Sequence, residues 1–165
     1  MQERRYSFID GAVAALPQRA PAHECVRQNI LAHATRRLRG SGCEPSRLPL
    51  VTGNGNVRHP DMTIDCGPME PDARIAGIPV AVFEVVPDTM GAVPVLLTLR
   101  DYAATPVIRH YVLIDLGTPR VLVYQRDIDG VFSLRPLDVR SLDAVLDLPS
   151  IGLKMPLADI YRGSA

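Results

Sequence analysis

The order of apolar and polar residues along the chain predicts two main helices and a series of short strands. Apolar side chains recur at roughly every fourth position over residues 21–39, which predicts an amphipathic helix, and a second helix is expected at about residues 95–104. Strands are expected in a hairpin over residues 6–16 that turns at Asp10-Gly11, and at residues 48–52, 57–66, 78–86, 110–116, 120–125, 131–137 and 151–155, with one helical turn at 157–161. This order predicts an α+β or α/β protein with a mixed central β-sheet flanked by helices, built as a single domain over residues 1–165.

The segment 78–86 differs from the other expected strands because it is apolar on both faces, which is typical of a central strand covered on both sides. Glu84 interrupts it, and a buried carboxylate needs a proton, a partner or a bound cation. Asp61 follows a proline near the start of the neighbouring expected strand. Two carboxylates on adjacent strands form a hard oxygen site for Mg²⁺ or Mn²⁺, with the backbone carbonyl of Val85 as a further ligand.

A purely structural interpretation of the same carboxylates is also open. Glu84 can form an internal ion pair with Arg100 or Arg109, and Asp61 can be an ordinary carboxylate at the start of a strand. The spacing of the residues alone does not separate this interpretation from a metal site.

Composition and charge narrow the function classes. The formal net charge is zero, so a DNA-binding role has to depend on a local basic patch rather than on the field of the whole protein. No apolar leader and no membrane-spanning run is visible, which predicts a cytoplasmic protein without a membrane partner. The three cysteines, Cys25, Cys43 and Cys66, form no C-x-x-C pair, so we expect neither a disulfide framework nor a zinc site.

Short motifs occur in a particular order along nearly the whole chain. They are Tyr6-x-Phe8-x-Asp10-Gly11, Pro21-x-His23 with Asn29, Arg58-x-Pro60-Asp61, Phe83-Glu84-Val85, and Asp101-Tyr102 leading into His110-Tyr111-Val112-Leu113-Ile114-Asp115. This ordered set resembles the Uma-type putative restriction endonuclease family, a bacterial branch of the PD-(D/E)XK nuclease superfamily.

The resemblance implies a restriction-endonuclease-like fold and Mg²⁺-dependent hydrolysis of DNA phosphodiester bonds. It assigns Asp61 and Glu84 to the positions of the metal-binding acids. DNA is then the expected partner, a homodimer would let the enzyme reach both strands of a duplex, and no small-molecule cofactor is expected.

One position departs from the family pattern. A lysine is typical on the helix after the glutamate strand, four residues before the tyrosine of the Asp-Tyr pair, and here that position holds Thr98. The only lysine in the chain is Lys154. Arg100 is the nearest cation, but two positions along a helix turn a side chain by about 200°, so it can act as a surrogate only if Pro94 distorts the helix.

Two functions therefore follow from the sequence. The chain is either a metal-dependent endonuclease with a substituted lysine position, or a catalytically inactive nuclease-fold protein that acts as a binding or assembly module. His23, near the start of the first expected helix, is a weaker candidate that would line the cleft beside the two acids.

Overall fold

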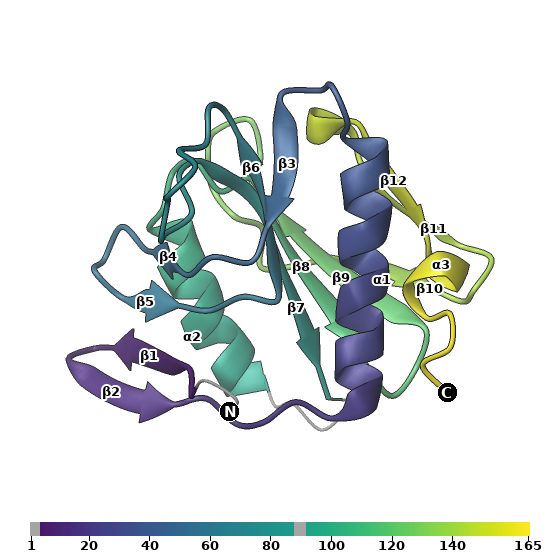
Figure 1. The fold of residues 1–165 in the computed structure, drawn as a ribbon, viewed down its shortest axis with the longest axis horizontal. Helices are drawn as coiled ribbons and strands as arrows, with labels where there is room; N and C mark the ends of the chain where they lie inside the picture. The colour runs from purple at the N-terminus through teal and green to yellow at the C-terminus, as the bar shows by residue number, and fades with distance from the viewer. Residues whose placement is uncertain (1–3, 88–91) are drawn as a thin grey trace.

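A six-stranded mixed sheet forms the centre of the computed structural model, which describes residues 4–87 and 92–165 (Figure 1). From one edge to the other, the strands are β10 (Leu137–Arg140), β9 (Arg120–Gln125), β8 (His110–Asp115), β7 (Pro79–Val86), β6 (Met62–Cys66) and β3 (Cys43–Ser46). Strands β7 and β8 run parallel, and every other pair of neighbours in this sheet is antiparallel.

Helices cover both faces of this sheet. Helix α1 (Pro21–Arg37) packs on one face, beside α3 (Leu157–Ile160) and the hairpin of β11 (Val145–Leu148) and β12 (Leu153–Pro156), which are joined by the 3₁₀ turn η1 (Pro149–Ile151). Helix α2 (Ala92–Ala103) connects the parallel strands β7 and β8 and packs on the other face. Phe83 and Val85 belong to the α1 core, whereas Val82 belongs to the α2 core. The predicted mixed sheet flanked by helices is confirmed.

A smaller four-stranded sheet lies beside the central one. Its strand order is β2 (Ala12–Ala15), β1 (Tyr6–Ile9), β5 (Val57–Arg58) and β4 (Leu50–Val51). The hairpin of β1 and β2 turns at Asp10 and Gly11, where φ is 49° and 84°. Two consecutive positive φ angles are required by the tight hairpin turn that the Asp-Gly pair predicted.

The segment expected as one strand over residues 57–66 is divided between the two sheets. Residues up to Arg58 pair in the small sheet, and pairing in the central sheet begins at Met62. Pro60 lies between these two paired segments. Because proline has no N–H to donate, it cannot continue a ladder of backbone hydrogen bonds. The chain therefore changes sheets at His59 and Pro60, directly before the candidate acid Asp61.

Some strands were missed or misplaced. Strand β3 contains Pro45, which hides it in the sequence but is tolerated because β3 is an edge strand. The strand expected over 131–137 is reduced to a single bridge at Phe132, and the pairing with β9 forms later, in β10. Strand β11 was not predicted.

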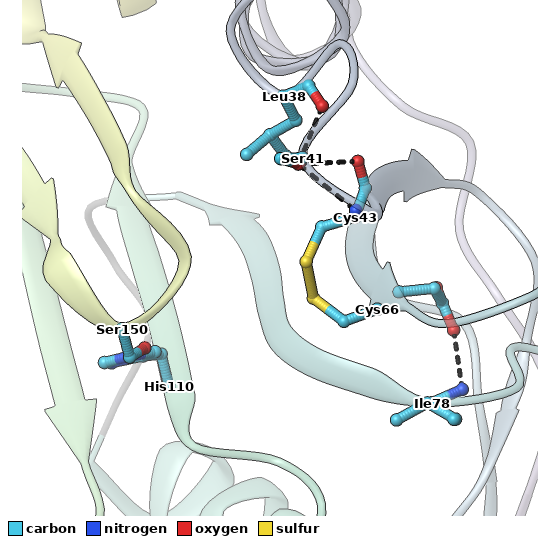
Figure 2. Close-up of a disulfide and its surroundings, with 8 residues drawn as sticks. Leu38, Ser41, Cys43, Cys66, Ile78, His110 and Ser150 are labelled. Atoms are coloured by element: carbon cyan, nitrogen blue, oxygen red, sulfur yellow. Dashed lines mark hydrogen bonds between the residues drawn. A yellow bond between two sulfur atoms is a disulfide. The ribbon is translucent and has the colours of Figure 1, made fainter.

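The expectation that the cysteines form no disulfide is wrong for one pair. Cys43 and Cys66 are register partners on β3 and β6, and they form a disulfide, whereas Cys25 is a free thiol (Figure 2). The side chain of Ser41 closes the turn before β3 by donating to the Leu38 carbonyl at 2.7 Å. Because β3 was not predicted, the cross-strand pairing of these two cysteines was not visible in the sequence.

None of the described helices is long and apolar enough to cross a bilayer.

Candidate active site

A cavity of about 550 Å³ lies where β7 ends and the chain passes between the two sheets. Its polar lining is contributed by Arg58, His59, Asp61, Glu84 and Thr98, with apolar side chains such as Leu16 and Leu97 around them. The predicted acids Asp61 and Glu84 thus line a single cavity, together with the threonine at the lysine position.

Strand register explains why the two acids meet. The last pair between β6 and β7 is Met62 with Phe83, so the next position places Asp61 opposite Glu84. The Asp61 N–H donates to the Phe83 carbonyl at 3.0 Å, and the Asp61 Oδ2 accepts from the Val85 N–H at 2.7 Å. Asp61 therefore ends the ladder by bonding to β7 with both its backbone and its side chain.

The Glu84 carboxylate is held by two tyrosines. Tyr102 on α2 donates its hydroxyl to Oε1 at 2.6 Å, and Tyr111 on β8 donates to Oε2 at 2.7 Å. Burial raises the pKa of Glu84 and the charge of Asp61 raises it further, although both tyrosine hydrogen bonds and Arg58 act in the opposite direction. Burial, followed by the charge of Glu84, also raises the pKa of both tyrosines well above its ordinary value, so they remain donors.

Asp61 contacts an arginine from the segment before α1 and a histidine from the first turn of α1. The Arg19 guanidinium contacts Oδ1, and His23 Nε2 lies 3.2 Å from Oδ2. Asp61 is only 5 % exposed, and its Oδ1 receives no hydrogen bond of normal geometry despite the arginine beside it. The structure thus places His23 against Asp61, although His23 does not line the cavity, and it adds Arg19.

Thr98, which occupies the position of the family lysine, is hydrogen-bonded to Arg58. The Thr98 hydroxyl donates to the Pro94 carbonyl at 2.9 Å and accepts from Nη1 of Arg58 at 3.2 Å. Arg58 also donates from Nε to the fully buried Asp101 carboxylate at 2.6 Å. A positive charge therefore lies against Thr98, although it comes from the small sheet rather than from α2.

The other cations considered from the sequence point elsewhere. The Arg100 guanidinium pairs with Asp10 and with Asp101, each at 3.1 Å, and it does not line the cavity. Lys154 is on β12, with its Nζ 3.7 Å from Asp147. Glu84 makes its hydrogen bonds with tyrosines, rather than with Arg100 or Arg109.

The oxygen atoms of the Asp61 and Glu84 carboxylates suit a hard divalent ion, but they would fill only part of its coordination shell. Asp61 and Glu84 supply carboxylate oxygens from opposed positions, and each oxygen has a further lone pair. No group of three or more His, Cys, Asp and Glu residues that could hold a metal occurs within residues 4–87 and 92–165. The remaining ligands would have to come from a backbone carbonyl, water and substrate.

Four residues that contact Asp61, Glu84 or Thr98 were not assigned to the site from the sequence. Arg19 lies in a segment without a regular pattern, and the role of Arg58 depends on a contact across forty residues. Tyr102 and Tyr111 did carry a signal, since a buried tyrosine hydroxyl generally finds a polar partner. The only ionisable residue in the apolar run of β7 is Glu84.

The fold and the opposed carboxylates define a restriction-endonuclease-like protein. A family model described as "Putative restriction endonuclease" (Uma2) matches residues 1–158. The chain therefore belongs to this family.

Two similar proteins support this placement. The uncharacterized protein slr1290 of Synechocystis sp. (strain ATCC 27184 / PCC 6803 / Kazusa) is 25% identical over 168 residues, which cover 99% of this chain and 87% of that protein. The crystal structure of a putative nuclease belonging to DUF820, from Anabaena variabilis ATCC 29413, matches with a TM-score of 0.80 at 17% identity. The match covers 99% of this chain and 93% of that one, and it establishes the shared fold.

Proposed function

We propose that this protein is an endonuclease that hydrolyses DNA phosphodiester bonds with a divalent metal ion. The observation that carries the proposal is that Asp61, Glu84 and Arg58 line one cavity. Two opposed carboxylates suit Mg²⁺ or Mn²⁺, and a guanidinium suits the phosphate that is to be cut.

Asp61 and Glu84 would hold the metal ion, with the Val85 carbonyl as a further ligand from β7. A bound ion of this kind lowers the pKa of an attacking water and stabilises negative charge on the phosphate. The two tyrosines fix the orientation of Glu84, and His23 contacts Oδ2 of Asp61.

Arg58 supplies the positive charge that the family lysine would supply. Its contacts with Asp101 and Thr98 fix the guanidinium, and these contacts use only some of its N–H donors. The other donors can stabilise charge on a phosphate oxygen in the transition state. Thr98 then positions Arg58 and does not itself take part in the reaction.

Arg19 competes with the metal ion for Asp61. Its guanidinium contacts the carboxylate oxygen that a cation would use, so metal binding requires this ion pair to open. We expect weak metal binding by the free protein and tighter binding when a DNA phosphate draws Arg19 away.

A plasmid-cleavage assay with Mg²⁺ or Mn²⁺ tests the proposal. We expect wild-type protein to nick plasmid, and expect Glu84→Gln and Arg58→Met to abolish nicking, while Arg58→Lys retains part of it. Arg74→Met is the matched control because Arg74 is exposed and does not line this cavity. Nicking that persists in Glu84→Gln would show that these carboxylates are not the catalytic site.

A non-catalytic binding or assembly module is the second candidate. It is favoured by the observation that both carboxylates already have partners within the protein, Asp61 with Arg19 and Glu84 with two tyrosines. This candidate predicts no cleavage and no change in melting temperature with Mg²⁺ or Mn²⁺, and no gain of activity in Thr98→Lys.

Sedimentation analysis with and without duplex DNA tests the homodimer that double-strand cleavage would favour.

A further inference from the structure

A second cavity, of about 510 Å³, adjoins the carboxylate site and is lined by arginines from four segments of the chain. We refer to these residues as the arginine pocket: Arg4, Arg5, Arg19, Arg27 and Arg47. They belong to the segment before β1, the segment before α1, helix α1 and the loop after β3. Residues so far apart in sequence meet here only because of the fold.

The arginine pocket carries an excess of positive charge. Glu24 pairs with Arg27, whose Nε lies 2.9 Å from Oε2, and Asp61 pairs with Arg19. Arg4, Arg5 and Arg47 have no ion pair within the part of the chain that the structure describes. All three are at least partly exposed, so an incoming anion can reach them.

Like charges in this pocket affect one another. Burial lowers the pKa of the Arg19 guanidinium, the Asp61 charge opposes this, and Arg5 and Arg27 lower the pKa further. Burial also lowers the pKa of His59, and the charge of Arg5 adds to the effect. A bound anion relieves this repulsion, because its charge is opposite and lies close to several guanidinium groups.

The arginine pocket adjoins the carboxylate site. Leu16, Pro17 and His59 line both cavities, and the contact between Arg19 and Asp61 crosses the boundary between them. A polyanion that occupies one cavity can therefore reach the other by passing over these shared residues, two of which are apolar.

We propose that the arginine pocket binds a phosphate group of the DNA strand that enters the carboxylate site. Guanidinium groups bind phosphate oxygens in paired hydrogen bonds, and several converging arginines suit the tetrahedral group better than a planar carboxylate. The choice of DNA rests on the proposed function. A phosphate held here fixes the position of the strand relative to Asp61 and Glu84, and it competes with Asp61 for Arg19.

Fluorescence anisotropy with labelled single-stranded DNA tests the pocket. The probes carry either a 5′-phosphate or a 5′-hydroxyl, and EDTA is present so that no cleavage occurs. The test variant is Arg5→Met with Arg47→Met, which leaves the ion pairs of Arg19 and Arg27 intact. Its matched control is Arg74→Met with Arg135→Met, which removes two exposed arginines outside both cavities.

We expect the Arg5→Met and Arg47→Met protein to bind DNA at least about tenfold more weakly, with a salt dependence reduced by roughly two phosphate contacts. Arg5→Lys with Arg47→Lys should recover most of the salt dependence, and inorganic phosphate should compete for wild-type protein. A loss confined to the 5′-phosphate probe identifies a terminal phosphate as the ligand, whereas an equal loss on both probes identifies an internal diester.

The proposal is overturned if the Arg5→Met and Arg47→Met protein binds like its control in affinity and salt dependence. Because binding is measured without metal, the outcome does not depend on catalysis. An inactive protein that shows the expected loss refutes the endonuclease function and leaves the pocket standing. An active protein without that loss refutes only the pocket.

Discussion

Substitution of Glu84 by glutamine should make the metal-free protein more stable at neutral pH. Burial raises the pKa of this carboxyl, so folding disfavours its ionised form. Glutamine has nearly the same shape and no charge. Its amide can still accept from one tyrosine hydroxyl and donate to the other, so the hydrogen bonds at 2.6 and 2.7 Å have replacements.

The expected gain depends on pH in a defined way. The folded protein binds the Glu84 proton more tightly than the unfolded chain does, so the contribution of Glu84 to stability is most favourable at acid pH. This contribution falls as the pH rises from the unfolded pKa, about 4.3, towards the raised folded pKa, with a slope of at most about 1.4 kcal/mol per pH unit. Above the folded pKa the loss stays constant, and the difference between variant and wild type reaches a plateau.

Urea denaturation followed by circular dichroism, at several pH values between about 4 and 8, measures this difference. The two proteins should have equal free energies of unfolding near pH 4, and that of Glu84→Gln should be larger at neutral pH. In a parallel thermal melt, each kcal/mol corresponds to about 2–4 °C in melting temperature. Glu70→Gln is the control because Glu70 is exposed. A variant that is less stable at neutral pH, or a difference that does not change with pH, refutes the reasoning.

Magnesium should reverse the order of stability. Wild-type protein should gain about 2.7 kcal/mol when the free ion is at a hundred times its dissociation constant, because only the folded state would form the proposed site. Glu84→Gln lacks one of the two carboxylate ligands and should gain much less. An equal response of the two proteins would remove Glu84 from the set of metal ligands.

Three further changes test other parts of the structure. Arg19→Met leaves the buried Asp61 without its arginine, so it should lower the melting temperature of the metal-free protein and increase Mg²⁺ affinity about fivefold or more in a calorimetric titration; unchanged affinity contradicts the proposed competition. Gly53→Ala places a methyl group against the Ala104 carbonyl oxygen and should cost about 1–3 kcal/mol in urea denaturation, where an unaltered midpoint would show that the contact is not rigid. Reduction of the disulfide, which spans 23 residues, should cost about 3 kcal/mol, or roughly 6–12 °C in a scanning melt; identical melts with and without reductant contradict it.

The centre of the fold could be predicted because its strands carry strong local patterns. Residues 78–86 and 120–125 are apolar and bounded by turn residues, and the Asp10-Gly11 pair requires a tight hairpin. Strand β3 could not be predicted, because it is four residues long and contains Pro45. The disulfide was missed for the same reason, since it depends on the pairing of that strand with β6.

Some residues of the candidate site could likewise be predicted from local sequence, and others could not. Asp61 and Glu84 were identified because a carboxylate next to a strand proline and another inside an apolar strand are locally unusual. The contact between Arg58 and Thr98 joins two elements that are forty residues apart, and no periodicity in the sequence reports such a contact. Arg19 lies outside any helix or strand, so its position against Asp61 is set by the path of the chain into α1.

The change of sheet between Arg58 and Asp61 constrains the length of the chain as well as its composition. Arg58 is fixed by pairing in the small sheet, and Asp61 by its bonds to β7, with two residues between them. An inserted residue in this segment would shift the guanidinium relative to the acid without removing either group. In homologous proteins, this two-residue spacing should therefore tolerate substitution at His59 more readily than any insertion or deletion.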